Sequence, residues 1–129
     1  MLKAKSIMAQ NVISVKEDTP IFEAVEIILE NKITGLPVVS DDMRLVGIIS
    51  EKDVLKLLYD PNTEEGIVAD FMTREVTYFD EDDELVLICE KLISSNFRRV
   101  PILSEGKLTG IISRHDIIKF IMKIRKNKA

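Results

Sequence analysis

The chain repeats itself, and this internal duplication limits its fold more than any other feature of the sequence. Residues 47–53 (Gly-Ile-Ile-Ser-Glu-Lys-Asp) return as residues 110–116 (Gly-Ile-Ile-Ser-Arg-His-Asp), 63 positions later. A unit of about 60 residues buries only about 60% of its surface, so we expect the two copies to fold together as one compact module. Upstream of these segments the spacing is 64, with matched pairs Met8/Met72, Val12/Val76, Asp18/Asp82, Pro37/Pro101 and Ser40/Ser104.

Composition and charge exclude several classes of protein. The 129 residues are 46% hydrophobic and 31% charged, which fits a globular protein of one domain. A net charge of -4 argues against general nucleic-acid binding, because binding to phosphate backbones requires a cationic surface. The single cysteine excludes an internal disulfide, and no apolar run resembles a membrane span or a signal peptide. We therefore expect a cytoplasmic protein without membrane contact.

After a short helical lead-in, hydrophobic periodicity predicts five elements in the first copy, in the order strand, helix, strand, strand, helix. Thr19 is the expected N-cap of the first helix, with Pro20 at its first position, and Ser50 is the expected N-cap of the second. We expect both strands of the hairpin between these helices to be buried on both faces. The predicted elements are a helical lead-in at 2–8, a strand at 12–15, a helix ending at 32–35 with Ile21, Val25, Ile28 and Leu29 on its apolar face, strands at 36–39 and 45–49, and a helix carrying Val54, Leu55, Leu57 and Leu58.

The second copy shows the same order of elements and predicts an α+β fold, an α/β-type sandwich. Between the copies, residues 60–66 are rich in turn-forming and acidic residues. We therefore divide the chain into repeat 1 (1–59), a linker (60–66) and repeat 2 (67–129). The predicted elements of repeat 2 are a short helix at 67–72, a strand at 76–79, a helix with Leu85, Ile88, Cys89, Leu92 and Ile93 on its apolar face, strands at 100–103 and 108–112, and a helix from 114 to about 125.

These features resemble the cystathionine-β-synthase (CBS) domain family. The resemblance rests on the order of elements, on the strands Leu36–Val39 and Val100–Leu103, and above all on the two Gly-Ile-Ile-Ser-x-x-Asp segments. Two copies in one chain resemble a CBS pair, also called a Bateman module. The resemblance implies two tandem β-α-β-β-α repeats related by a pseudo-two-fold axis, with clefts that hold adenine nucleotides or other adenosyl ligands. It also implies a disc-shaped homodimer.

The two Ser-x-x-Asp segments have a structural and a functional interpretation. Ser at the N-cap and an acid three residues later form a capping box, although Glu or Gln is the usual acid. Because Asp is shorter, we expect it to reach the N-cap amide less well, which leaves its carboxylate freer to bind a ligand diol. The CBS resemblance assigns Asp53 and Asp116 to ribose hydroxyls, and Ser50 and Ser113 to ribose or phosphate contacts. Capping and ligand binding can coexist.

Repeat 2 is the more cationic copy. Arg98-Arg99 stands where repeat 1 has Thr34-Gly35, and Arg114-His115 stands where repeat 1 has Glu51-Lys52. A helix N-terminus favours anions, and guanidinium groups bind phosphate with two parallel hydrogen bonds. The resemblance places such a basic pair on nucleotide phosphates. The alternative is that both arginines are ordinary surface charges.

An adenine ring requires a flat, dry slot. The resemblance places this slot between the first strand of each copy and its proline-containing strand. Most of the residues concerned are also candidates for the core, and the polar members of the two sets occupy different registers. The expected slot residues are Ile13, Ser14, Leu36, Pro37 and Val38 for one site, and Thr77, Tyr78, Pro101 and Ile102 for the other.

Other polar features have simpler explanations than a site of their own. His115 is the only histidine and lacks partners at metal-ligand spacing, so we expect phosphate contact or solvent exposure. Cys89 is expected in the core, and the acidic segment 80–84 is expected to be a solvated loop before a helix. The basic residues of the C-terminal tail could contact RNA or could complement the helix dipole. They are Lys119, Lys123, Arg125, Lys126 and Lys128.

These patterns predict a regulatory module and no enzyme. No nucleophile with a paired base, metal-ligand cluster or glycine-rich phosphate loop is evident, so we expect no catalysis, no metal and no obligatory cofactor. The first hypothesis is a stand-alone sensor that binds AMP, ADP, ATP or S-adenosylmethionine and signals to an unidentified partner protein. The second is a dimerisation or docking scaffold without ligand, whose clefts are vestigial, and repeat 1 is where we expect an empty cleft. The third is a nucleic-acid-associated protein acting through the basic tail.

Overall fold

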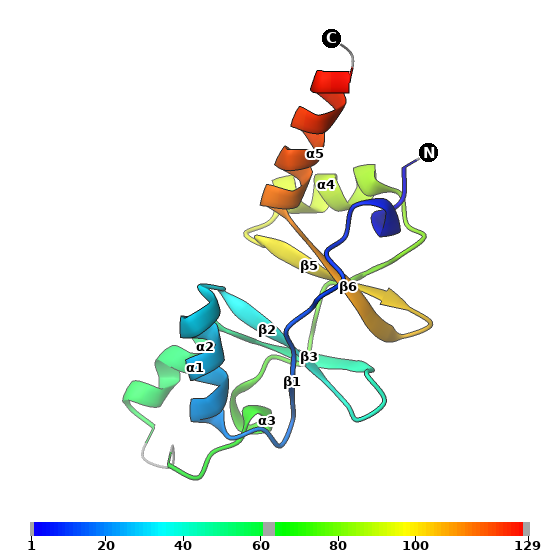
Figure 1. Ribbon diagram of the computed structural model, residues 1–129. Coiled ribbons are helices and arrows are strands. Elements are labelled where there is room, and N and C mark those ends of the chain that lie inside the picture. The colour runs from blue at the N-terminus through cyan, green and yellow to red at the C-terminus, as the bar shows by residue number, and fades with distance from the viewer. Residues whose placement is uncertain (1, 61–63, 128–129) are drawn as a thin grey trace. The chain divides into compact units, whose positions relative to one another are not determined.

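The computed structural model describes residues 2–60 and 64–127, and these form two compact units (Figure 1). One unit runs from Ile13 to Val76 and is called the repeat-1 unit below. The other combines residues 1–12 with residues 77–129 and is called the repeat-2 unit. Residues 61–63 of the predicted linker lie outside the described residues. The predicted boundaries of the repeats and their union into one module stay predictions.

The repeat-1 unit is a three-stranded sheet packed against a helix. The strands lie in the order β1-β2-β3, with β1 parallel and β3 antiparallel to β2. Val15 faces Val38 across the parallel pair, and Leu36 faces Ile49 across the antiparallel pair. The elements are β1 (Val15–Lys16), α1 (Ile21–Asn31), β2 (Gly35–Val39), β3 (Leu45–Ser50), α2 (Glu51–Leu55), the 3-10 turn η2 (Lys56–Leu58) and α3 (Val68–Phe71).

The repeat-2 unit has the same plan, which confirms the predicted α+β fold. Its strands lie in the order β4-β5-β6, again with one parallel and one antiparallel pair. Phe79 faces Ile102, and Val100 faces Ile112. The elements are η1 (Ala4–Ser6), β4 (Phe79–Asp80), α4 (Leu85–Ser94), β5 (Arg99–Ser104), β6 (Lys107–Ser113) and α5 (Arg114–Asn127).

Each unit buries a cluster of aliphatic side chains between its sheet and its first long helix. On α1 the buried residues Ile21, Ala24 and Ile28 recur at helical spacing and meet the strands of the sheet. Burial of each large aliphatic side chain contributes about 1.5–3 kcal/mol. Leu29 and Ile93 were predicted on the apolar faces, but they are 73% and 79% exposed. Each follows the buried stripe by one residue, a turn of about 100° that points the side chain outward.

Several local predictions are wrong for identifiable reasons. The first helix begins at Ile21 after Pro20, and Thr19 instead closes the preceding turn by accepting a hydrogen bond from the amide of Lys16 at 3.0 Å. The first strand of each repeat is later and shorter than predicted, because only two residues of it pair with the central strand. In β3, buried and half-buried residues alternate, so this strand is not buried on both faces.

The segment before the first strand of each repeat, residues 2–12 in repeat 1 and 67–76 in repeat 2, is called its lead segment. Each lead segment pairs with the sheet of the other repeat. Ala9 and Ile111 exchange two backbone hydrogen bonds, at 2.9 and 3.0 Å, along the outer edge of β6. Thr73 and Ile48 exchange two at 2.8 Å along the outer edge of β3. Each edge strand therefore gains a short backbone partner from the other repeat's lead segment, which satisfies amides that an exposed edge would leave unpaired.

The repeated glycines allow this close approach. A Cβ atom on Gly47 would lie 2.9 Å from the Thr73 carbonyl oxygen and 3.0 Å from Met72 Sδ. Gly110 faces Met8 and the Ala9 carbonyl oxygen in the corresponding place. The matched methionines of the two lead segments therefore pack onto the matched glycines of the edge strands.

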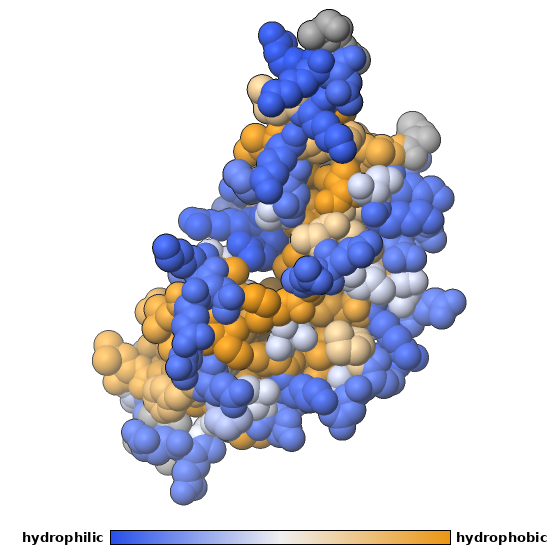
Figure 2. Space-filling view, in the orientation of Figure 1, coloured by the Kyte–Doolittle hydropathy of each residue, from blue (hydrophilic) through white to orange (hydrophobic). Residues whose placement is uncertain are grey.

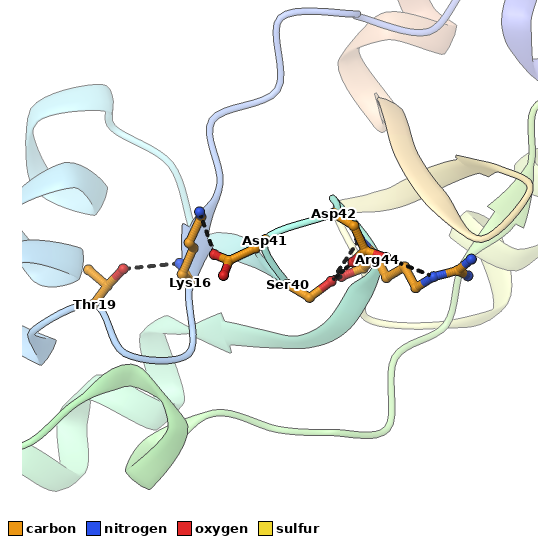
Figure 3. A network of polar contacts seen from close by, with 6 residues as sticks. All are labelled: Lys16, Thr19, Ser40, Asp41, Asp42 and Arg44. Atoms are coloured by element: carbon orange, nitrogen blue, oxygen red, sulfur yellow. Dashed lines mark hydrogen bonds and ion pairs between the residues drawn. The ribbon is translucent and has the colours of Figure 1, made fainter.

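Surface ion pairs hold two of the irregular segments. Lys5 in the lead segment pairs with Asp82 at 2.9 Å, and its hydrogen bond and charge lower the pKa of Asp82. In the other unit, Lys16 pairs with Asp41 at 2.7 Å, which links β1 to the β2–β3 turn (Figure 3). In that turn Ser40 donates a hydrogen bond to Asp42 and lowers its pKa, while Arg44 binds the same carboxylate at 3.2 Å. Such exposed pairs order the turns more than they stabilise the fold.

Candidate functional site

The first Ser-x-x-Asp segment forms a complete capping box at the start of α2. Asp53 Oδ2 accepts hydrogen bonds from the Ser50 amide and the Ser50 hydroxyl, both at 2.9 Å. The Asp53 amide donates to Ser50 Oγ at 3.4 Å, which completes the box. The expectation that the shorter Asp side chain reaches the N-cap amide less well is therefore wrong for Asp53. Ser50 is extended as it leaves β3, and this brings its amide within reach of the shorter acid.

Asp53 is also bound by a residue from the lead segment of repeat 2. The Thr73 hydroxyl donates to Asp53 Oδ1 at 3.1 Å. Asp53 is only 5% exposed, and Lys56 lies 3.8 Å from the same oxygen. Both oxygens of this carboxylate are therefore engaged within the repeat-1 unit, and little of it is accessible to a ligand.

The second Ser-x-x-Asp segment has the same cap without the additional partner. Asp116 Oδ2 accepts from the Ser113 amide at 2.8 Å, and the Asp116 amide donates to Ser113 Oγ at 3.1 Å. Within residues 2–60 and 64–127, no hydrogen bond reaches Asp116 Oδ1. Asp116 is half-buried at the N-terminus of the long helix α5. Capping therefore uses one carboxylate oxygen and leaves the other accessible.

Arg98 and Arg99 lie beside this helix start. The Arg98 carbonyl accepts a hydrogen bond from the Arg114 amide at 2.9 Å, and Arg99 faces Ser113 across the β5–β6 pair. Arg98 is exposed and Arg99 is half-buried. The Nε atom of Arg99 is buried and has no hydrogen-bond partner in the described part of the chain. A buried donor without an acceptor costs about 1–3 kcal/mol, so this position favours the binding of an acceptor.

The Arg114 side chain binds away from this junction, and His115 is exposed to solvent. Arg114 donates to the Ser95 carbonyl at 2.9 Å, which ties the start of α5 to the end of α4. His115 is exposed. Among the predicted basic contacts, the structure thus brings Arg98 and Arg99 to the Ser113–Asp116 junction, whereas Arg114 is engaged elsewhere.

The expected adenine-slot residues divide into core and surface groups. Leu36, Val38 and Ile102 have no exposed surface and belong to the clusters beneath the helices. Pro37 and Pro101 are also buried, and Ser14 and Thr77 are half-buried. Ile13 and Tyr78 are 41% and 55% exposed. The position of the adenine ring stays a prediction, and the accessible candidates for it are the residues just before β1 and β4.

Sequence reasoning missed Thr73 as a residue of the site. The repeat contains the relevant signal, because Thr73 corresponds to Ala9 at the spacing of 64, directly after the matched pair Met8 and Met72. The two positions form equivalent backbone bridges to Ile48 and Ile111. Only the threonine has a hydroxyl to donate to the neighbouring carboxylate. Its importance could not be seen until the exchange of lead segments was known.

The remaining candidate features are accounted for locally. Within residues 2–60 and 64–127, no three His, Cys, Asp or Glu side chains gather as metal ligands would, and no helix is long and apolar enough to cross a membrane. Cys89 is half-buried and packs against the core of its unit. In the acidic segment, Asp83 accepts from the Asp80 amide at 2.8 Å. Lys119 and Lys123 are exposed on α5, whereas Lys128 lies outside the described residues.

A family profile for the CBS domain matches the chain twice, over residues 4–60 and 68–123. The chain is a CBS-domain pair. Both matches contain the complete Ser-x-x-Asp junction of their repeat, and the lead-in residues from Ala4 and Val68 onward are part of them. The structure of each unit agrees with this assignment, because each repeat has the β-α-β-β-α order.

Similar proteins extend this result. The chain is 37% identical to an uncharacterized protein of Methanocaldococcus jannaschii, MJ1225, over 91% of its own length and 42% of the relative. It is 30% identical to CBSX2 of Arabidopsis thaliana solved with AMP, with a TM-score of 0.87 and coverage of 97% and 99% of the two chains. The CBS pair of MJ0100, solved with 5′-methylthioadenosine and S-adenosyl-L-methionine, is 27% identical, with a TM-score of 0.78 and coverage of 95% and 98%. The chain spans less than two thirds of the length of curated relatives such as MJ1225.

Proposed function

We propose that this CBS pair binds an adenosine-containing ligand, such as AMP, ADP or ATP, at the Ser113–Asp116 junction. One observation carries the proposal: an accessible oxygen of Asp116 and an unpaired, buried Nε of Arg99 occur at the same strand-to-helix junction. The first group accepts hydrogen bonds and the second donates them, as ribose hydroxyls and phosphates require. The structures of CBSX2 with AMP and of MJ0100 with adenosyl ligands support this choice of ligand.

Each group at the junction has a distinct role in the proposal. Asp116 Oδ1 accepts hydrogen bonds from the ribose diol while Oδ2 continues to cap α5. Arg98 and Arg99 bind the phosphate with charge-assisted hydrogen bonds. The dipole of α5 adds a favourable field for the anion at the N-terminus of this helix. Ser113 stays close enough to contact either the ribose or the phosphate.

The proposal assigns the ligand to repeat 2 and leaves the corresponding junction of repeat 1 without one. Asp53 is almost fully buried, and both of its oxygens already accept hydrogen bonds. Thr34 and Gly35 stand where repeat 2 has its two arginines, so repeat 1 lacks the cations for a phosphate. A ligand there would have to displace the Thr73 hydroxyl and would gain no ion pair.

In this proposal the bound ligand has a regulatory role and is not chemically converted. The groups at the junction bind and orient, and the proposal assigns none of them to an acid–base or nucleophilic step. A ligand changes a protein's state only through its different affinity for two conformations. We infer that AMP binding changes the conformation that the CBS pair presents to a partner. The partner is a domain of the same chain or another protein.

Calorimetry with AMP tests the proposal on two matched variants. Asp116→Asn keeps a carbonyl oxygen that can cap α5 but replaces the second oxygen by an amide donor. We expect AMP affinity to fall about 10-fold or more, because hydrogen bonds to charged groups contribute about 1.5–3 kcal/mol. Asp53→Asn is the control and should leave AMP affinity within about twofold. Equal affinity for both variants and the unaltered protein would exclude the ribose contact.

A second candidate function, self-association as a docking scaffold, is favoured by apolar side chains on the helices. Leu58, Ile93 and Leu29 are 94%, 79% and 73% exposed in the described structure. Exposed apolar side chains that gather into a contiguous patch mark interaction surfaces. We therefore include a homodimer in the proposed function. Sedimentation equilibrium measures it directly, and a chain that stays monomeric at about 100 µM would contradict it.

A further inference from the structure

The connection between α4 and β5 leads directly into the two arginines of the proposed phosphate site. Its counterpart between α1 and β2 begins with Lys32, whose left-handed backbone (φ 53°) lets its amide donate to the Ile28 and Leu29 carbonyls. In repeat 2, Ser95 follows α4 with an extended backbone (φ -127°, ψ 174°). A left-handed turn therefore closes the end of α1, whereas the chain leaves α4 extended, so other contacts must hold the segment before the arginines.

Side chains from both neighbouring helices hold this extended connection. Ser95 Oγ donates to the Lys91 carbonyl at 2.7 Å and accepts from the Phe97 amide at 3.3 Å. The Lys91 ammonium lies 5.8 Å from the centre of the Phe97 ring, within the range of a cation–π contact. From the start of α5, Arg114 Nη2 donates to the Ser95 carbonyl at 2.9 Å. The end of α4 and the start of α5 therefore bind the same residue of the connection.

Arg114 binds this connection at two places. Its amide donates to the Arg98 carbonyl at 2.9 Å, and its guanidinium donates to the Ser95 carbonyl. The first contact recurs in repeat 1, where the Glu51 amide donates to the Thr34 carbonyl at 3.0 Å. The second cannot recur there, because an ionised carboxylate has no proton to donate to a carbonyl. The backbone contact is therefore common to both repeats, and the guanidinium contact is specific to repeat 2.

The guanidinium contact lies beside an apolar groove between α4 and α5. The groove measures about 370 Å³, and its lining includes Leu92, Ile117 and Ile118 together with Arg114. Figure 2 shows hydrophobic surface at the base of α5 and hydrophilic side chains along its outer part. A hydrogen bond is electrostatically stronger where apolar groups exclude water. These surroundings strengthen the contact, although Arg114 as a residue is exposed.

We propose that Arg114 is a positioning residue for the phosphate site of repeat 2. By binding the Ser95 carbonyl, its guanidinium fixes the connection that leads into Arg98 and Arg99 and orders both arginines at the helix junction before the ligand arrives. A site that is ordered in advance loses less conformational entropy when it binds. Arg114 itself makes no contact with the ligand and acts through the two arginines. This inference rests on the proposed function and explains how the phosphate-binding side chains are held in place.

Calorimetry with AMP and adenosine on Arg114→Gln tests this role. Glutamine is shorter and uncharged, so the contact with the Ser95 carbonyl is weakened or lost. We expect AMP affinity to fall about fivefold, while adenosine, which does not use the arginines, changes by less than about twofold. Lys119→Gln removes one charge from the same helix and is the matched control, which should leave both affinities within about twofold. Unchanged AMP affinity in Arg114→Gln overturns the positioning role.

A double-mutant cycle separates positioning from direct contact with the phosphate. In a chain that carries Arg98→Ala and Arg99→Ala, Arg114→Gln should cause no further loss of AMP affinity, because the residues through which it acts are gone. A further fivefold loss in this background would show that Arg114 binds the phosphate itself and would overturn the positioning role. Failure of either test in a chain that binds AMP refutes this inference alone. A chain that does not bind AMP refutes the proposed function together with it.

Discussion

The two repeats have the same order of elements and the same Ser-x-x-Asp motif, but the aspartates of the two motifs differ in burial and in hydrogen-bond partners. In repeat 1 the carboxylate of Asp53 is buried and also accepts from Thr73, a residue 20 positions away. In repeat 2 the carboxylate of Asp116 caps its helix with one oxygen and keeps the other accessible. The same motif therefore engages both carboxylate oxygens in repeat 1 and leaves one of them accessible in repeat 2. The residue contributed by the lead segment makes the difference.

The second contrast between the repeats lies in the cations beside each motif. Repeat 1 has Thr34 and Gly35 at the entrance to its central strand, and repeat 2 has Arg98 and Arg99. A Cβ atom on Gly35 would lie 3.0 Å from the Ile49 carbonyl oxygen, so a larger residue there requires the neighbouring backbone to shift. Arg99, in contrast, holds a buried donor without a partner. The two copies thus differ in their cations and in the pairing of their polar groups at this junction.

The largest expected effect comes from removing the cations of repeat 2. Replacement of Arg98 and Arg99 by Ala should weaken AMP binding about 100-fold, because two charge-assisted contacts to the phosphate are lost. Adenosine, which lacks the phosphate, should lose no more than about threefold. Calorimetry with both ligands measures the contrast. Equal losses for the two ligands would indicate damaged packing of β5 instead of a lost phosphate contact.

Replacing the edge-strand glycine by alanine should destabilise repeat 1 more than repeat 2. Gly47→Ala places a Cβ atom 2.9 Å from the Thr73 carbonyl oxygen, so the backbone of the lead segment must move. We expect the free energy of unfolding to fall by about 1–3 kcal/mol, the usual cost of overpacking. Urea denaturation measures this change. Gly110→Ala should cost less, because Met8 can move its flexible side chain away, and equal losses would contradict this difference.

Exchanging the lead-segment residues should exchange the properties of the two motifs. Ala9→Thr places a hydroxyl where it can donate to Asp116, so AMP affinity should fall about fivefold as that oxygen becomes engaged. Thr73→Ala removes the hydroxyl from Asp53 and should lower the free energy of unfolding by about 1 kcal/mol. Calorimetry and urea denaturation report the two effects. Unchanged AMP affinity in Ala9→Thr would show that the accessibility of Asp116 does not distinguish the repeats.

The smallest expected effect concerns the ion pair between Lys5, in the lead segment of repeat 1, and Asp82. The hydrogen bond and charge of Lys5 lower the pKa of Asp82, so this pair contributes stability above the unfolded-state pKa of the carboxyl group. That contribution is lost as the pH falls through the lower folded-state pKa. Lys5→Ala should return the pKa of Asp82 toward its ordinary value in an NMR titration. A pKa that does not move would assign its lowering to other neighbours.

Part of the site could be predicted from the residues because it depends on local chemistry. The Ser50 and Ser113 caps follow from a capping residue placed directly after an apolar strand. The hairpins follow from β-branched runs around turn residues, and the helices from their apolar spacing. The short parallel strands before α1 and α4 were misplaced, because two residues have too little periodicity to mark their ends.

The sequence by itself determined the duplication, the CBS-domain pair, the elements of each repeat and the contrast between Arg98-Arg99 and Thr34-Gly35. Each of these depends on residues that are neighbours in the sequence or that recur at a fixed spacing. Only the tertiary structure decided which lead segment meets which sheet and, through Thr73 and Ala9, which carboxylate stays accessible. Those contacts join residues that are distant along the chain. Backbone pairing at a strand edge, which any residue except proline can make, leaves no mark in the sequence.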